Sequence, residues 1–284
     1  MPREVALTFD YDAMSVWIGS YGSGSSGALS RGEFGLIGVG RILKLLEKYE
    51  IPGTFFVPGH TALAFPDSVR EIFAAGHEIG HHGYVHERIG GLEPEREREV
   101  LELGFEALDS VAGVRPRGYR SPSWEFTPAT PGLLQDFDFV YDSSLMATDF
   151  TFFWPRSGDE APVDGPYVFG DEVPIVEAPV SWSLDDFPHF EYVSKGAGPA
   201  NLKSPAQVFD VWWAEFEFFA ELPDADCFTL TMHPQVIGRG SRLAMLERFI
   251  QSIKDAGDFK FTRLGDATEL WKLGQDGVPK GDRR

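Results

Sequence analysis

Residues 54–87, TFFVPGHTALAFPDSVREIFAAGHEIGHHGYVHE, decide the fold. The apolar, β-prone residues Thr54 to Val57 predict a strand, and residues from Asp67 to about Ala75 predict a short helix. Glu78 to Gly80 predicts a second strand, and Gly83 marks the tight loop that follows it. A strand, a helix and another strand of these lengths favour a parallel sheet with helices between its strands.

The same alternation continues on both sides of this stretch. On the amino-terminal side, Glu4 to Phe9 predicts a buried strand and Leu36 to Tyr49 an amphipathic helix. On the carboxyl-terminal side, helices are predicted at 94–112, 204–222, 241–256 and 264–273, and strands at 118–120, 139–143, 226–233 and 259–263. Repetition of this kind predicts an α/β parallel sheet or barrel, whose functional sites lie at the carboxyl ends of the strands.

Three segments break the alternation. Gly19 to Gly35 contains six glycines and five serines and is expected to be a loop. No Gly-Lys-Ser/Thr follows it, so a mobile flap or a linker fits better than a phosphate-binding loop. Residues 146–200 are interpreted as an insertion, long enough to act as a lid, within one catalytic domain of residues 1–284. Residues 275–284 are expected to form a flexible tail.

The composition narrows the class of protein. With 43% hydrophobic and 14% aromatic residues, 284 residues suffice for a substantial core. The formal net charge of −19 disfavours nucleic acid and membrane surfaces as partners. No apolar run approaches the roughly 18 residues of a membrane span. The single Cys227 fits a reducing compartment, and the first residues do not resemble a signal peptide, so a cytoplasmic protein is expected.

Four of the seven histidines lie between His77 and His86. His82 and His86 are four residues apart, so one helical turn after Gly83 would direct both imidazoles to one side. Such a pair can bind a divalent metal such as zinc, which in catalytic sites has three protein ligands and an open position. Taken alone, the pair is as often two solvated surface side chains.

Two aspartates follow the first predicted strand and can supply the third ligand. On an extended backbone Asp10 and Asp12 point the same way. Two neighbouring carboxylates resist joint ionisation unless a cation or an arginine lies between them. The alternative is a pair of solvated or capping aspartates. Because these aspartates and the histidine pair both fall at carboxyl ends of predicted strands, we expect them to meet.

In this order, the motifs resemble those of the polysaccharide deacetylase family, also called carbohydrate esterase family four. Thr8–Asp12 is similar to the first motif with one residue inserted between the aspartates, and Gly80–His86 to the second. Arg120-Ser121-Pro122 resembles the third motif, and Leu230–His233 the last. Ser183–Phe187 departs from the fourth motif, in which many members have an aspartate followed by tryptophan. The resemblance implies a distorted (β/α) barrel with seven or eight strands.

The inserted Tyr11 and the long middle segment resemble one subgroup of this family. That subgroup includes cyclic imide hydrolases, metal-independent allantoinase-like enzymes and a peptidoglycan deacetylase homologue. The resemblance therefore implies a hydrolase of non-peptide C–N bonds. Two substrate classes follow from it: a small intracellular amide or cyclic imide, which we favour, and an N-acetylated sugar in a glycan or peptidoglycan.

The resemblance also implies roles for individual residues. Asp12, His82 and His86 would hold the metal, with zinc the expected ion. Asp10, kept ionised by Arg120, would be the general base that takes a proton from water.

His233 would be the general acid that protonates the departing nitrogen, oriented by Asp185 or Asp186. Asp185 is the first choice for that orienting acid. The alternative from another class is an inert barrel that only binds a glycan or a small ligand.

Aromatic residues suggest which side chains contact the substrate and indicate that the chain forms an oligomer. Trp124, Trp182 and Phe187 are the expected substrate contacts, because they fall beside the third motif or on the predicted lid. The helix at 204–222 carries aromatic residues on more than one face, which predicts a homo-oligomer.

Overall fold

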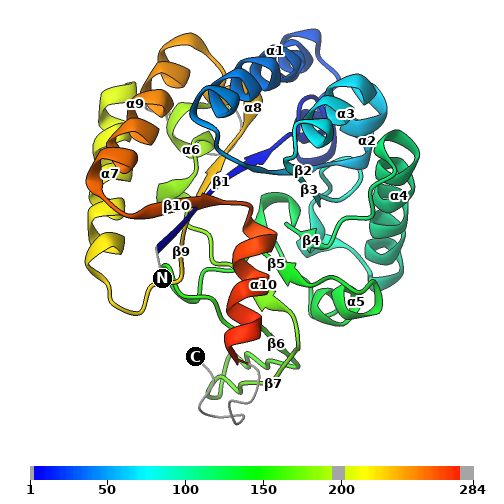
Figure 1. The fold of residues 1–284 in the computed structure, drawn as a ribbon. Coiled ribbons are helices and arrows are strands. Elements are labelled where there is room, and N and C mark those ends of the chain that lie inside the picture. Colours follow the sequence, from blue (N-terminus) through cyan, green and yellow to red (C-terminus); the bar gives the residue numbers. More distant parts are fainter. Residues whose placement is uncertain (1–2, 194–201, 276–284) are drawn as a thin grey trace.

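The protein is described by a computed structural model that covers residues 3–193 and 202–275. Eight strands form one sheet in which every pair is parallel. The strands are β1 (Arg3–Asp10), β2 (Thr54–Val57), β3 (Glu78–His81), β4 (Gly118–Tyr119), β5 (Tyr141–Asp142), β8 (Val176–Glu177), β9 (Cys227–Met232) and β10 (Phe259–Thr262). The predicted α/β barrel is confirmed (Figure 1).

Strand β1 pairs with three other strands of the sheet. Strand β9 pairs with it along one edge, while β10 and then β2 pair with successive halves of the other edge. The order continues from β2 through β3, β4 and β5 to β8. Residues 4–10 are all buried, as expected for a strand covered on both faces.

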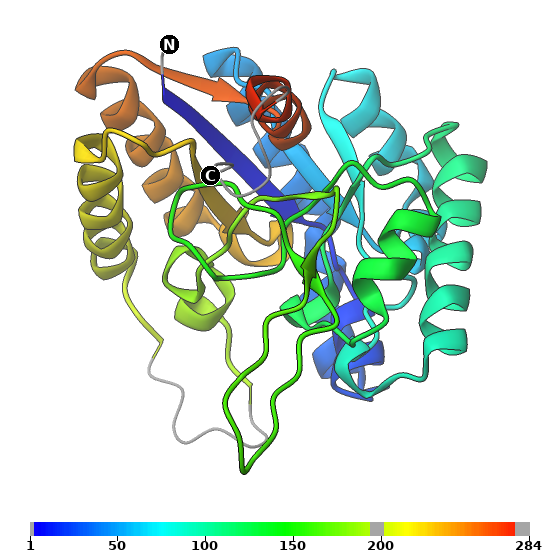
Figure 2. The same cartoon turned by 90° about the horizontal axis from the view of Figure 1, so that it is seen from below.

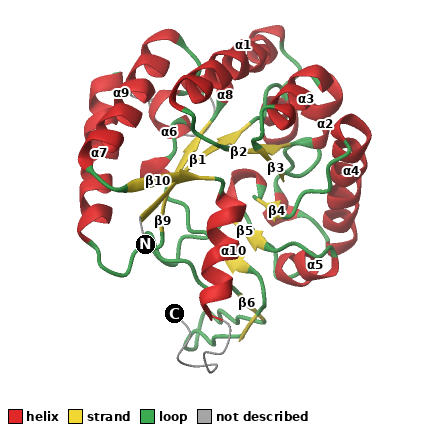
Figure 3. Ribbon diagram, viewed as in Figure 1, coloured by secondary structure: helices red, strands yellow, loops and turns green. Residues whose placement is uncertain are grey.

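Helices surround the curled sheet, as Figure 3 shows. They are α1 (Ser26–Tyr49), α2 (Gly59–Ala64), α3 (Pro66–Ala74), α4 (Pro94–Ala112), α5 (Thr130–Asp136), α6 (Phe187–Phe190), α7 (Pro205–Glu221), α8 (Pro234–Ile237), α9 (Gly240–Ala256) and α10 (Leu264–Gln275). Among the described residues, none of these helices is both long and apolar enough to cross a membrane.

The loop predicted for Gly19 to Gly35 is wrong over most of its length. Helix α1 begins at Ser26, and the side chain of Ser25 caps it by accepting a hydrogen bond from Ala28 N. Two glycines of this helix serve packing, because a Cβ on Gly32 would lie 2.4 Å from Ala13 O and one on Gly38 would lie 2.0 Å from Pro234 O. Gly22, Gly24 and Gly27, in contrast, have open space where a Cβ would lie.

The predicted insertion at 146–200 is partly built into the barrel. Strand β8 belongs to it and pairs with β5. Asp185 forms a parallel bridge with Thr231, so the segment also reaches β9. Ahead of β8 in the chain, β6 (Arg156–Ser157) and β7 (Asp171–Glu172) form a hairpin that projects from the body (Figure 2). Residues 194–200 and the predicted tail beyond Gln275 lie outside the described residues.

Helix α7 buries most of the aromatic surface that suggested an oligomer. Trp212, Phe216 and Phe219 are buried, and Phe209 and Trp213 pack against Phe249 of α9. Phe218 is 52% exposed. A homo-oligomer stays a prediction, and α7 supports it with this one exposed ring.

Two phenylalanines on α7 offer a test of this packing. Phe216 contacts the rings of Phe228, Phe249 and Phe259, so Phe216→Ala should lower the free energy of unfolding by about 3–5 kcal/mol. Phe218→Ala should change it by about 0.5 kcal/mol or less, because that ring lies in water. Urea unfolding of both variants provides the comparison. Equal losses would mean that the Phe218 face is also buried, as in a subunit contact.

Candidate metal centre and active site

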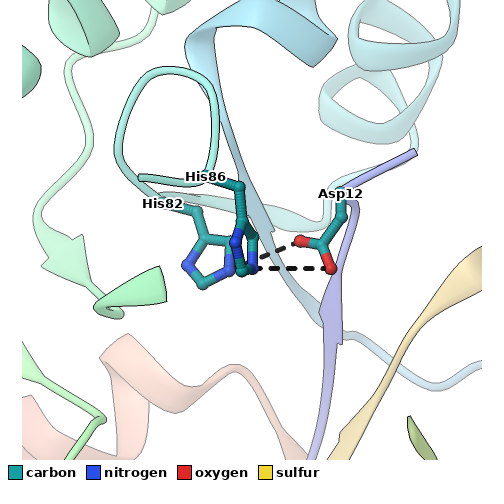
Figure 4. Close-up of side chains that lie close together, drawn as sticks. All are labelled: Asp12, His82 and His86. Atoms are coloured by element: carbon teal, nitrogen blue, oxygen red, sulfur yellow. Dashed lines mark ion pairs between the residues drawn. The ribbon is translucent and has the colours of Figure 1, made fainter. Parts of the chain in front are cut away.

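The carboxyl ends of β1, β3 and β9 bring the predicted site together. Asp10 ends β1, His82 follows β3 and His233 follows β9. Asp12 faces two histidines, with 3.4 Å from its Oδ1 to His82 Nε2 and 3.7 Å from its Oδ2 to His86 Nε2. Figure 4 shows both imidazoles directed at this carboxylate. All five side chains are buried.

Hydrogen bonds fix which ring nitrogen of each histidine faces Asp12. His82 Nδ1 donates to the backbone oxygen of Arg120 at 2.6 Å. His86 Nδ1 lies 2.6 Å from Ser20 Oγ, whose own hydrogen goes to His86 O at 2.9 Å, so the ring nitrogen must be the donor. Both Nδ1 atoms therefore carry hydrogen, which leaves Nε2 of each ring as the atom that can bind a metal.

The site has the unsatisfied atoms that a cation would complete. Both carboxylate oxygens of Asp12 and Nε2 of His82 are buried without a hydrogen-bond partner among the described residues. Burial opposes charge on Asp12, but His86, His82 and His233 lower its pKa to about 2. Burial lowers the pKa of His86 to about 4, so this ring is neutral near pH 7. Burial also opposes charge on His82, but Asp10 and Asp12 outweigh it and raise its pKa. The ionised carboxylate of Asp12 and the neutral ring of His86 are ligand forms that a divalent metal binds, and His82 would bind the metal once Nε2 has lost its proton.

The loop that carries the histidines is not the helical turn that their spacing suggested. Residues 82–88 have no helical hydrogen bonds, and His86 has a positive φ of 61°. Glu87 holds the loop by accepting hydrogen bonds from the backbone of Tyr84 and Val85. Gly83 has φ 67°, which lets the chain turn directly after β3. A bent loop thus brings together the side chains that a helix would have brought together by periodicity.

A second segment locks this loop in place. The short helix η1 (Val16–Ser20) lies against it, and a Cβ on Gly19 would lie only 2.0 Å from Val85 O. Only glycine permits this approach, which sets Ser20 beside His86. Ser20 could not be predicted as a partner of His86, because it lies in the stretch interpreted as a loop.

Arg120 holds Asp10 from below the site. Its Nη1 donates to Asp10 Oδ1 and to Thr8 Oγ1, both at 2.8 Å. Its remaining donors bind Ser143, as Nε reaches the backbone oxygen at 3.0 Å and Nη2 reaches Oγ at 2.8 Å. Asp10 Oδ2 stays free to face the pocket, 3.9 Å from His82 Nε2.

His233 is oriented chiefly by Asp186. Asp186 Oδ1 lies 2.7 Å from His233 Nδ1 and also accepts the His233 backbone N–H at 3.0 Å. Asp185, the first choice from the sequence, lies 3.4 Å from the same nitrogen and caps Phe187 N instead. Burial disfavours the imidazolium, but these carboxylates outweigh it and raise the pKa of His233 well above its usual value. The geometry therefore favours Asp186 as the orienting acid.

Aromatic side chains wall the pocket above these groups. Trp124 and Trp182 lie against each other with ring centroids 4.1 Å apart, and the ring of Phe187 lies 5.2 Å from that of His233. All three predicted aromatic contacts line the pocket, which encloses about 100 Å³. Val16 and Tyr21, which the sequence analysis missed, complete the wall from the η1 side. Residues 158–170, within the projecting hairpin, do not line it.

A family model and two known proteins are similar to this chain. A family model described as polysaccharide deacetylase matches residues 2–141 of this chain. A peptidoglycan deacetylase of Helicobacter pylori is 36% identical over 89% of this chain and 91% of its own length. A peptidoglycan deacetylase-like protein of Gibberella zeae is 28% identical over 89% of this chain and 81% of its own.

Two solved structures have the same fold as this chain. A provisionally assigned polysaccharide deacetylase from Mycobacterium smegmatis superposes with a TM-score of 0.85 at 37% identity, covering 98% of this chain and 92% of that one. The Puue allantoinase shares the fold, with a TM-score of 0.76 at 24% identity over 97% of this chain and 92% of its own.

The fold and these relatives define a hydrolase of non-peptide C–N bonds. The chain belongs to the polysaccharide deacetylase family. These relatives do not favour the alternative of an inert binding barrel.

The unsatisfied atoms around Asp12 predict stoichiometric metal binding. Calorimetric titration of chelator-treated protein with Zn²⁺ should show about one site per chain. His82→Ala and His86→Ala should abolish it, and Ser20→Ala should weaken it about 10- to 100-fold because the His86 tautomer is no longer fixed. His77→Ala is the control, since His77 accepts a hydrogen bond from Gly53 N at the other end of β3. Unchanged binding in both ligand variants would contradict the assignment.

Proposed function

We propose that this chain is a metal-dependent hydrolase that cleaves the amide C–N bond of a small amide or cyclic imide. The observation that carries the proposal is the short, aromatic-walled pocket over the buried acid–base groups. Its volume of about 100 Å³ is small beside the roughly 300–1,000 Å³ of pockets that take drug-sized ligands, which favours a small reacting group. A planar amide or imide is such a group, and the faces of Trp124 and Phe187 suit it.

The metal would be held by Asp12, His82 and His86, and zinc fits their donor atoms best. A divalent cation there would polarise the amide carbonyl and lower the pKa of an attacking water. Each histidine is prepared for this by the hydrogen bond at its Nδ1. A cytoplasmic location and a homo-oligomeric state accompany the proposal as predictions.

Asp10 would act as the general base. Arg120 donates to Oδ1 and fixes the orientation of the carboxyl group, while Oδ2 is left to accept a proton from water in the pocket that Asp10 lines. Because Asp10 is held by a side chain from another strand, it keeps its orientation when the proton arrives.

His233 would act as the general acid. Its Nδ1 hydrogen is directed to Asp186, so Nε2 faces the pocket and can carry the proton that the departing nitrogen needs. Strands β1 and β9 are paired, which places the base and the acid at neighbouring strand ends. Burial raises the pKa of Asp185 to about 7, so this carboxyl can meet a substrate in its neutral form near pH 7.

A glycan or peptidoglycan deacetylase is the second candidate function. The similarity to the peptidoglycan deacetylase of Helicobacter pylori favours it. An acetamido group is small enough for the pocket, and the sugar would then lie outside, against Trp182, which is 47% exposed.

Substitution of the base separates its role from that of the metal ligands. Asp10→Asn should keep the metal and lower kcat by about 10²–10⁴-fold, because an amide cannot accept the proton from water. His233→Ala should also lower kcat, chiefly for substrates whose amine departure limits the rate. Metal content by elemental analysis and steady-state rates provide the two readouts. Loss of metal in Asp10→Asn, together with activity in Asp12→Asn, would reverse the two roles.

A substrate panel tests the small-molecule proposal. Zinc-loaded protein should open succinimide-type rings or allantoin-like ureides with higher kcat/KM than it deacetylates N-acetylglucosamine oligomers, because the pocket encloses only a small planar group. Asp10→Asn supplies the background rate. Efficient acetate release from the oligomers, with no turnover of any ring, would establish the glycan candidate instead.

A further inference from the structure

Two acidic side chains lie buried behind the site and take no part in the reaction described above. Asp142 on β5 and Glu177 on β8 are direct partners in the register of these parallel strands. Neighbouring residues in such a register point to the same face of the sheet. Both side chains have no solvent exposure. Burial of two carboxyl groups costs free energy unless hydrogen bonds or a shared proton compensate for it.

The contacts of the pair leave one position for a shared proton. Glu177 Oε1 accepts the backbone N–H groups of Ser144 and Leu145 at 2.8 and 2.9 Å, and Asp142 Oδ1 accepts the hydroxyl of Ser144 at 2.9 Å. The other oxygens, Asp142 Oδ2 and Glu177 Oε2, are buried with no donor among the described residues. Because Asp142 and Glu177 are register partners, their carboxyl groups interact: Glu177 lowers the pKa of Asp142 and Asp142 raises that of Glu177, as expected where one carboxyl group keeps a proton that the other accepts.

The proton belongs mainly to Glu177. Burial and the charge of Asp142 raise the pKa of Glu177 well above its usual value. Burial also raises the pKa of Asp142, to about 6, against the lowering effect of its bonds to Glu177 and Ser144. The pair therefore carries about one negative charge, close to the buried cation of Arg120.

The pair is joined to the catalytic groups through residues 143 and 144. Ser143 lies between Asp142 and Ser144 and supplies two of the acceptors of Arg120. The hydroxyl of Ser144 also accepts the N–H of Ser121, the residue after Arg120. Asp142 and Glu177 thus hold the segment that carries Ser143, the partner of Arg120, and also the backbone next to Arg120.

We propose that Asp142 and Glu177 form a proton-sharing clamp that positions Arg120, and through Arg120 the carboxylate of Asp10. The pair acts as a positioning element, since neither side chain lines the pocket. Its catalytic consequence rests on the proposed role of Asp10 as base. The effect of the pair on Arg120 does not depend on that role, so the positioning of Arg120 and the catalytic consequence can be measured separately.

The first test follows Arg120 itself in the metal-loaded protein. The Nε–H of Arg120, assigned in ¹⁵N spectra with Arg120→Lys, should exchange with solvent at least about tenfold faster in Glu177→Ala. Glu177→Gln should retain protection, because its amide N–H replaces the shared proton while Oε1 still accepts both backbone groups. Unchanged exchange in Glu177→Ala, or equally fast exchange in Glu177→Gln, would overturn the clamp.

An infrared measurement tests the shared proton. The difference between the pH 7 spectra of the wild type and Glu177→Gln should contain the carbonyl stretch of a buried neutral carboxylic acid, in which the contribution of Asp185 cancels. A difference spectrum without such a band would overturn the protonation of the pair. If Glu177→Ala does not fold, Ser143→Ala serves instead: it removes one acceptor of Arg120, and its Nε–H exchange should rise several-fold. Exchange at the wild-type rate in Ser143→Ala would then count against the clamp.

Turnover completes the test. Glu177→Ala should lower kcat about tenfold or more with little change in KM, and Glu177→Gln should restore it. The matched control is Glu78→Ala, which removes a carboxylate bound by Thr54, Tyr141 and Gly265 at the amino end of β3 and should cost stability without lowering kcat. Faster Arg120 exchange without loss of turnover would disprove the role of Asp10 as general base. Equal kcat losses in Glu177→Ala and Glu78→Ala would disprove a specific effect of Glu177 on the active site.

Discussion

The site depends on one buried guanidinium. Arg120 has no solvent exposure, so its N–H groups must find acceptors within the protein. Those acceptors come from two strand regions, with Thr8 and Asp10 on β1 and Ser143 just after β5. The backbone oxygen of the same residue receives His82 Nδ1. The ring of Phe56 lies beneath the cation at 4.2 Å. A single arginine thus relates the proposed base, one metal-binding histidine and the clamp.

Much of the fold could be predicted because its signals are local and repeated. The strand from Glu78 and the helix at 94–112 are marked by apolar periodicity and by proline or glycine at their ends. The aspartates and histidines could be expected to meet because carboxyl ends of parallel strands gather on one side of a sheet. The start of α1 was missed because glycine signals both flexibility and tight packing, and only the neighbours of Gly32 and Gly38 distinguish the two.

Other parts of the site could not be predicted, because they depend on contacts between distant segments. Ser20 lies 66 positions from His86 and meets it only because Gly19 permits close approach. Asp185 and Asp186 are adjacent in the chain, and no pattern tells which one turns towards His233. The register of β5 and β8 pairs Asp142 with Glu177 across residues that appeared to be an insertion. In each case the sequence supplied the chemical group and tertiary structure supplied its partner.

The close contact at Gly19 has a consequence for how the centre is assembled. Because η1 and the histidine loop touch through their backbones, Asp12 and His86 sit on two segments that are already joined in the absence of any ion. The entropy of ordering these loops is therefore lost during folding rather than during metal capture. A metal centre here would tolerate emptying and refilling without local unfolding, and its selectivity for an ion would come from the fixed separation of its donor atoms instead of from a loop that adapts to each radius.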